Sequence, residues 1–171
     1  FTLTAGELNC TNEAGAARTF TVDGQATIGP DSGAADQATL TQTSQDLTIG
    51  TGKTDEPALN IKRGGTYVGG SGLCTFGSIS ADNHANCKFT LSSNTTTING
   101  HSADDTRPLV LGGTSTGTAA HGGGTIVITY GGGAYNLSNY ATTSLNNLTL
   151  NSNVTATISS PSIVMAGNLT I

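Results

Sequence analysis

Apolar and polar residues alternate with a period of two along almost the whole chain. The apolar members come in short groups: Phe1/Leu3, Phe20/Val22, Ala26/Ile28, Leu47/Ile49, Leu59/Ile61, Phe89/Leu91, Ile126/Ile128/Tyr130, Leu148/Leu150, Ala156/Ile158, Ile163/Met165 and Leu169/Ile171. Because successive side chains of a strand point to opposite faces, this pattern predicts short, half-buried β-strands. Glycine pairs and triplets between the groups predict tight turns, and no stretch carries the long apolar stripe of a helix. The sequence therefore predicts an all-β protein.

A repeated triplet distinguishes between a β-sandwich and a β-solenoid. Leu-Thr-Ile or Leu-Thr-Leu, preceded by Asp or Asn, occurs at 46–49, 147–150 and 168–171, and the last two copies are 21 residues apart. Two further apolar groups, at 154–158 and 163–165, lie between those copies. One solenoid coil with three short strands accounts for this spacing. We predict a β-solenoid with Gly-rich corners and inserted loops, and a β-sandwich is the alternative.

The length of 171 residues favours a single β-rich domain over residues 1–171, or a section of a longer repetitive protein. The chain starts at Phe1 and stops inside an expected strand at Ile171, which favours a section. Residues 108–171 contain no Asp, Glu, Lys or Arg. Stacked like charges repel, whereas Thr, Ser and Asn stack well, so this part is predicted to hold the most regular coils.

Composition narrows the possible partners. Six Lys and Arg stand against eleven Asp and Glu, and Lys62-Arg63 is the only basic pair of note, so nucleic acid is not an expected partner. No apolar run approaches the roughly 18–20 residues needed to cross a bilayer, so no transmembrane segment is expected in this stretch. Nothing in the pattern indicates a cofactor, and the glycine runs precede no helix that could cradle a phosphate.

The three cysteines have two interpretations. Cys10, Cys74 and Cys87 fit no metal-ligand spacing, so no metal site is expected. Cys74 and Cys87 could form a disulfide that closes a short loop and stabilises the fold by roughly 3 kcal/mol. The alternative is that all three are small buried residues.

Acidic pairs and histidines are the remaining candidates for chemistry. Asp104-Asp105, Asp55-Glu56 and Asp82 with Asn83 contain the clustered acids, but neighbouring carboxylates on a strand point to opposite faces, and in a loop they cap turns. His84, His101 and His121 are far apart and lie in apparent turns. We therefore expect no catalytic residues. A polysaccharide-active enzyme using Asp104, Asp105, Asp82 and Tyr130 is kept as an alternative.

Three further patterns concern the surface. Tyr67, Tyr130, Tyr135 and Tyr140 could stack on sugars if three shared a face. Thr-x-Thr repeats could form an outward array that orders water, but uneven spacing argues against one, and the β-propensity of Thr explains them. Asn-x-Ser/Thr sequons, the possible glycosylation sites, occur at Asn9, Asn94, Asn136, Asn147, Asn153 and Asn168.

Several segments resemble the repetitive β-solenoid portions of bacterial and phage surface proteins, namely 64–72, 88–100, 124–138, 143–152 and 165–171. This class includes filamentous-haemagglutinin-like adhesins and autotransporter passenger domains. The resemblance implies an elongated, extracellular, structural or adhesive cell-surface protein and brings no catalytic residues. Cysteines are uncommon in that class, and this chain has three. The difference is compatible with a subunit that is held in a filament through sulfur chemistry.

We expect a non-enzymatic surface protein of this kind, a filament or surface-layer subunit, whose partners are other copies of itself or surface glycans. A phage tail fibre or receptor-binding protein is the second interpretation, and it would form a trimer.

Overall fold

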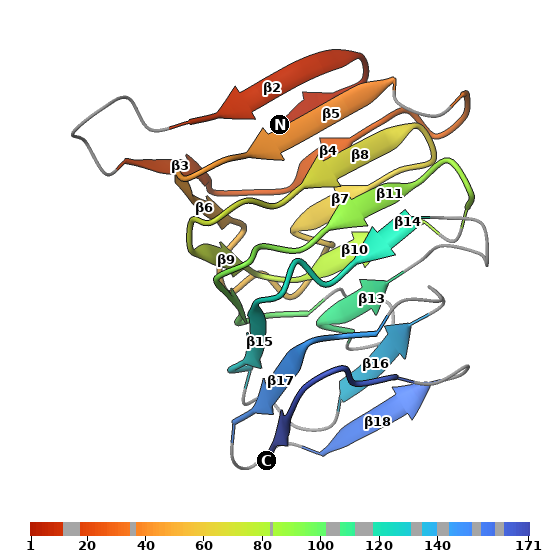
Figure 1. Cartoon of the computed structure of the whole chain (residues 1–171). Helices are drawn as coiled ribbons and strands as arrows, with labels where there is room; N and C mark the ends of the chain where they lie inside the picture. Colours follow the sequence, from red (N-terminus) through yellow and green to blue (C-terminus); the bar gives the residue numbers. More distant parts are fainter. Residues whose placement is uncertain are drawn as a thin grey trace.

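The chain forms a parallel β-solenoid. The computed structural model describes residues 1–11, 18–34, 37–82, 84–101, 107–111, 118–130, 135–139, 144–151, 155–159 and 163–171. Three sheets, here called A, B and C, run along its length, and successive coils lie one below the other in Figure 1. Every pairing between strands of the described chain is parallel, which excludes the β-sandwich alternative, whose sheets are antiparallel.

Among the described residues, each of the first five coils contributes one short strand to each of the three sheets, and the last two coils contribute strands to sheets A and C. Sheet A contains β1 (Thr2–Leu3), β4 (Ala26–Ile28), β7 (Leu59–Ile61), β10 (Ile79–Ala81), β13 (Leu109–Leu111), β16 (Tyr135–Asn139) and β18 (Ala156–Ser159). Sheet B contains β2 (Gly6–Cys10), β5 (Ala38–Gln42), β8 (Gly65–Val68), β11 (Lys88–Thr90) and β14 (Thr118–Ala120). Sheet C contains β3 (Thr19–Val22), β6 (Asp46–Ile49), β9 (Cys74–Phe76), β12 (Thr95–Ile98), β15 (Thr125–Ile128), β17 (Asn147–Leu150) and β19 (Leu169–Thr170).

The predicted 21-residue coil is confirmed. Leu148 of β17 pairs with Leu169 of β19, and β18 in sheet A lies between them in the sequence. The third expected segment forms only an isolated parallel bridge, between Met165 and Leu145. The upstream triplet falls in the same column, because Leu47 occupies the corresponding place in β6. All three copies of the repeat therefore stack in sheet C.

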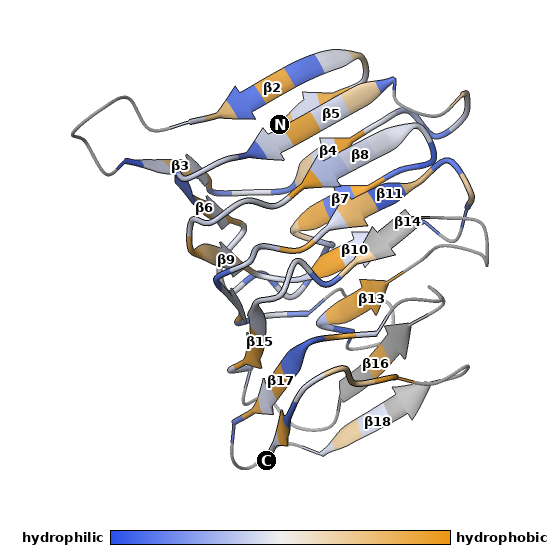
Figure 2. Ribbon diagram, viewed as in Figure 1, coloured by the Kyte–Doolittle hydropathy of each residue, from blue (hydrophilic) through white to orange (hydrophobic). Residues whose placement is uncertain are grey.

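Inward-facing side chains fill the solenoid with one continuous apolar core. Burial alternates along the strands, as in β5, where every second residue is buried. The large members of the core include Phe76, Phe89, Leu40 and Ile98, all at most 2% exposed. Figure 2 shows the same alternation of apolar and polar residues along the ribbon. The described residues include no helix long and apolar enough to cross a membrane.

Glycines at the corners allow successive coils to approach closely. A Cβ on Gly77 would lie 2.0 Å from the carbonyl oxygen of Gly50 in the preceding coil, and one on Gly70 would lie 2.1 Å from that of Thr43. Both contacts are too close for any side chain, so these corners require glycine. The glycine-rich stretch at Gly122 is a coil corner of this kind.

Candidate functional site

The outer face of sheet C carries a column of threonines that runs the length of the described solenoid. Register places these residues next to one another from coil to coil: Thr21, Thr48, Thr75, Thr97, Val127, Thr149 and Thr170. We call this column the threonine ladder, and Val127 is its one departure. Each member alternates with an inward residue, so each side chain points away from the core.

The side chains of the threonine ladder face solvent. Thr21 and Thr170 are exposed and the other members are half-buried. Among the described residues, the six ladder hydroxyls make no hydrogen bond to another protein group. Thr is β-branched and holds a preferred side-chain rotamer, so the hydroxyls and methyls form an ordered row.

A second outer column of sheet C lies two residues before the ladder in each strand. It consists of Thr19, Asp46, Leu73, Thr95, Thr125, Asn147 and Asn168. Asp46 is the one charged residue in the two columns, and its Oδ1 accepts the Leu73 backbone N–H at 2.8 Å. Asn147 Oδ1 accepts the Asn168 N–H at 2.9 Å in the same way. These side chains link successive coils and leave the face almost uncharged.

The outer face of sheet B differs. Its columns contain Glu7 and Lys88 among threonines, and Thr41 Oγ1 donates to Glu7 Oε1 at 3.4 Å.

The expectation that uneven spacing prevents an array of outward threonines is wrong for sheet C, where the threonine ladder is such an array. The loops at the corners absorb the differences in coil length and the strands keep their register.

A buried polar cluster lies between sheets B and C. Gln42 is 1% exposed, and its Oε1 accepts the Gly70 N–H at 3.0 Å while its Nε2 donates to the Gln45 carbonyl at 2.7 Å. Cys74 Sγ lies 3.5 Å from Gln42 Oε1 and 3.5 Å from Tyr67 Oη. Burial, followed by the neighbouring Cys74, raises the pKa of Tyr67 well above its usual value. The cluster is an internal link between coils.

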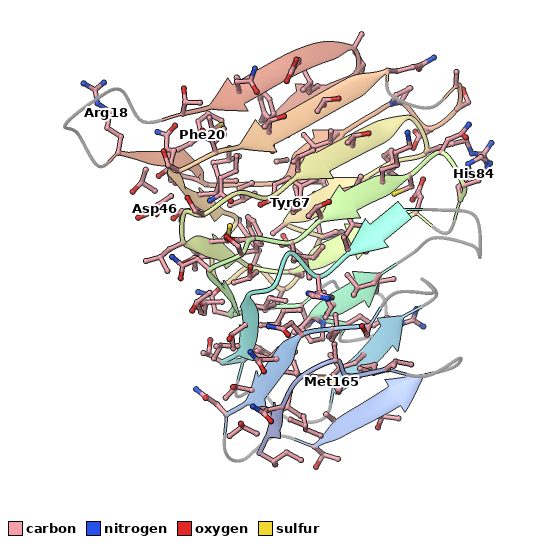
Figure 3. The ribbon with its side chains drawn as sticks, viewed as in Figure 1. Arg18, Phe20, Asp46, Tyr67, His84 and Met165 are labelled. Carbon is pink, nitrogen blue, oxygen red and sulfur yellow. The ribbon has the colours of Figure 1, made fainter. Side chains whose placement is uncertain are left out.

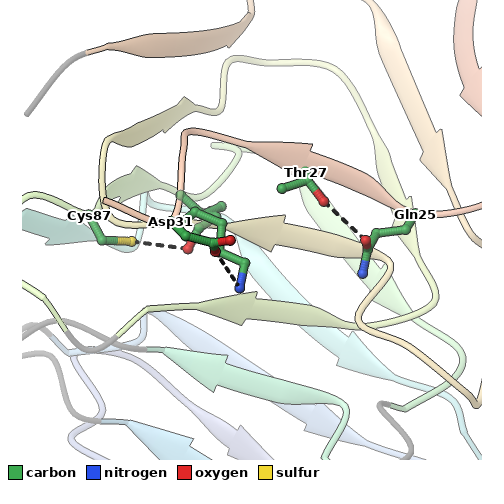
Figure 4. Close-up of polar contacts among 6 residues, drawn as sticks. Gln25, Thr27, Asp31 and Cys87 are labelled. Atoms are coloured by element: carbon green, nitrogen blue, oxygen red, sulfur yellow. Dashed lines mark hydrogen bonds and ion pairs between the residues drawn. The ribbon is translucent and has the colours of Figure 1, made fainter. Parts of the chain in front are cut away.

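The structure contains no disulfide between Cys74 and Cys87, the pairing considered as one of two interpretations of the sequence. Both thiols and that of Cys10 are free and buried. Cys74 faces the core from β9, whereas Cys87 precedes β11 and its Sγ lies 3.5 Å from the Ile61 carbonyl oxygen (Figure 4). Burial raises the pKa of Cys87 to about 12. Cys74 lies in a strand and Cys87 lies in a corner, and the two thiols contact different partners, which agrees with the interpretation of small buried residues.

The described members of the acidic groups noted in the sequence lie at two different corners of the solenoid. Asp55 and Glu56 are exposed and line a cavity of about 80 Å³ at the corner from sheet C to sheet A. Asp82 directly follows β10 at the corner from sheet A to sheet B. Asp104, Asp105 and Asn83 lie outside the described residues. In the part of the chain that is described, no group of three or more His, Cys, Asp or Glu side chains could hold a metal ion.

The histidines also lie apart. His84 Nδ1 accepts the Asn86 N–H at 3.0 Å, and Figure 3 shows His84 on the side of the molecule away from Asp46. His121 Nδ1 accepts the Gly123 N–H at 2.9 Å. His101 packs edge to face against Tyr130, with ring centroids 4.7 Å apart. The first two thus stabilise turns.

One of the four tyrosines considered for a sugar platform lies away from the surface. Tyr67 is 1% exposed and lies inside the core (Figure 3). Tyr130 is half-buried beside His101. Tyr140 and the side chain of Tyr135 lie outside what the structure describes. The alternation could have placed Tyr67 inward, because it stands two residues after Gly65 in a strand whose other face is Thr and Val.

The sequons differ in accessibility. Asn9, Asn94 and Asn168 are exposed and Asn147 is half-buried. Asn94 Nδ2 donates to the Ser71 carbonyl at 3.0 Å, so its amide nitrogen is engaged. Asn153 and the side chain of Asn136 lie outside the described residues. Asn9, on the outer face of β2, is an exposed candidate for glycosylation.

An apolar cavity of about 220 Å³ lies at the last two coils. Leu137, Leu148, Leu150, Ile163, Met165 and Leu169 contribute to its lining. Leu169 is 50% exposed and Ile171 is 86% exposed. The cavity thus adjoins the exposed apolar side chains at 169–171.

The fold and its surfaces define the class, a parallel three-sheet β-solenoid with a hydroxyl-rich outer face. Comparison with protein-family models, with curated proteins and with solved structures finds no match.

Proposed function

We propose that this chain is a non-enzymatic, extracellular structural or adhesive surface protein that acts as a stiff rod, as a filament or surface-layer subunit. The carrying observation is the stacking of successive coils in parallel register on three faces around one core. Such a stack resists bending because every coil is hydrogen-bonded to the next. Neutral outer columns of Thr, Ser and Asn keep the rod hydrated without charge repulsion along its axis.

Strand edges at the two end coils support self-association. β2 and β3 are terminal in sheets B and C at one end, and β18 and β19 are terminal in sheets A and C at the other. An edge strand has unpaired N–H and C=O groups that accept a strand from another chain. Beside β19, exposed Leu169 and the apolar cavity add surface that a second copy would bury.

Electron microscopy of the purified chain over a range of concentrations tests this proposal. We expect rods that lengthen into filaments as concentration rises. Leu169→Asp should abolish the filaments, because it places a charge at the β19 edge. Val164→Asp is the matched control, since Val164 is similarly exposed, at 56%, but belongs to no strand. Filaments that are equally abundant in both variants would place the junction elsewhere.

A glycan panel tests the adhesive form. Retention of the chain on one class of surface glycan, with no change in the glycan, is expected for an adhesin. Particles that stay monomeric and bind no glycan contradict the proposal. A discrete trimer would favour the phage-fibre interpretation, and release of sugars from a polysaccharide would favour an enzyme.

A further inference from the structure

The threonine ladder offers a row of hydroxyls at a fixed repeat. Its members are set by backbone pairing between coils, so adjacent hydroxyls are separated by about 4.8 Å, the distance between hydrogen-bonded strands. Along each strand, the second outer column lies two residues away, at about 6.7 Å. Nine of the fourteen residues in the two columns are threonines. The face is therefore a two-dimensional array with Thr as its dominant member.

The chemistry of the face fits an uncharged lattice. Asp46 is its one charged residue, and that carboxylate already accepts a backbone N–H. A phosphate, an anionic polymer or a mineral surface would meet no complementary charge. The two columns contain no aromatic residue, although aromatic rings are what usually stack on sugars. What the face does provide is hydroxyls free of protein partners among the described residues, beside Thr methyls.

Preorganisation also favours a repeating partner. The χ1 angle of Thr is restricted, and the solenoid holds each Thr backbone in place, so little freedom is lost on binding. Each hydroxyl makes a weak contact, but contacts repeated over the coils add up to a long-lived attachment. Water in ice is such a partner, because its oxygen lattice is neutral, donates and accepts hydrogen bonds, and has a short repeat close to the strand spacing.

We propose that the outer face of sheet C binds ice through the threonine ladder. The ladder hydroxyls take positions in the water lattice at the crystal surface, and the Thr methyls fill the spaces between them. Growth is then hindered at the bound surface. Ice binding does not depend on whether the chain forms filaments. The filament proposal and the ice-binding proposal are therefore tested separately.

Inhibition of ice recrystallisation by the purified chain is the test. We expect inhibition well below the concentration at which an unrelated protein of similar mass acts. Thr97→Lys, in the middle of the ladder, should raise the lowest inhibiting concentration about tenfold. Thr39→Lys is the matched control, because Thr39 is also half-buried and faces outward, but from sheet B. It should leave inhibition unchanged.

A substitution that should increase the inhibition of ice recrystallisation provides a second test. Val127→Thr completes the ladder and should lower the inhibiting concentration about two- to threefold. Val110→Thr, the same change on the outer face of sheet A in the same coil, should have no effect. Circular dichroism checks that all four variants keep the fold.

Three results would overturn the proposal. They are inhibition no better than that of the unrelated protein, equal losses for Thr97→Lys and Thr39→Lys in folded proteins, and partition of the chain onto crystalline chitin or cellulose but not into ice. The last result would assign the face to a polysaccharide.

Discussion

Replacement of Gln42 by leucine tests whether the buried polar cluster links coils. Leucine has a similar volume, so the change removes the amide with little effect on packing. Two backbone groups lose their close partner, the Gly70 N–H at 3.0 Å and the Gln45 carbonyl at 2.7 Å. Two longer contacts of 3.5 Å, to the Leu73 carbonyl and from the Cys74 thiol, are lost as well. Gly70 and Gln45 both belong to the corner from sheet B to sheet C, one in each of two adjacent coils. The perturbation is therefore a broken connection between coils.

The magnitude follows from the two shorter contacts. A polar group left without a partner costs about 1–3 kcal/mol, so two such groups cost about 2–6 kcal/mol. Both bonds are only partly buried, and water can satisfy some of the lost contacts, while the new leucine gains apolar burial. We expect a loss of about 3 kcal/mol, which for a chain of this length lowers the melting temperature by about 6–12 °C.

Thermal unfolding followed by circular dichroism measures the global effect, and hydrogen exchange measures the local one. Because solenoid coils can unfold separately, the clearest expected sign is faster exchange of the Gly70 amide. Gln37→Leu is the control, since Gln37 is exposed, and it should change stability by under about 0.5 kcal/mol. Unchanged exchange at Gly70 together with an unchanged melting temperature would refute the reasoning.

Three further substitutions test corners, thiols and core. Gly77→Ala should cost about 1–3 kcal/mol in urea unfolding, because its Cβ meets the Gly50 carbonyl, whereas Gly24→Ala, with no atom within 4 Å, should be nearly neutral. Since folding raises the Cys87 pKa from 9.0 to about 12, its contribution is complete below pH 9 and is lost as pH rises through that range. The slope is about 1.4 kcal/mol per pH unit, and Cys87→Ala should remove this component from a pH series of melts. Phe76→Ala, at a site with no exposed surface, should cost about 3–5 kcal/mol by denaturant titration.

The alternation of apolar residues could predict which side of each strand faces the core. Phe20, Ile49 and Leu148 all point inward as the pattern indicates. Strands with small or polar inward residues were harder to find. β5 buries Ala38 and Gln42, and β8 begins with a glycine that resembles a turn signal. Burial of such residues depends on how closely the next coil approaches, and this information is absent from local hydropathy.

Register across unequal coils could not be derived from spacing. The corner from sheet C to sheet A takes residues 50–58 in one coil and only 77–78 in the next, yet the flanking strands stay in line. Thr48, Thr75 and Thr97 are consequently separated by unequal numbers of residues but occupy one column. Sequence periodicity therefore fails as a test for a continuous array, because hydrogen bonds between strands fix the register and the loops do not.

This separation of strand register from loop length bears on function. In a solenoid, the chain can insert residues at a corner without moving the outer columns, because each strand pairs only with the coils above and below. An ordered face can then persist while the loops vary, and the ladder on sheet C is the one on which nearly every coil supplies the same side chain. Uniformity of one face, beside mixed faces on sheets A and B, is difficult to attribute to β-propensity, which acts on all three sheets alike. This contrast between the faces is the reason for which we assign the proposed ice binding to the outer face of sheet C.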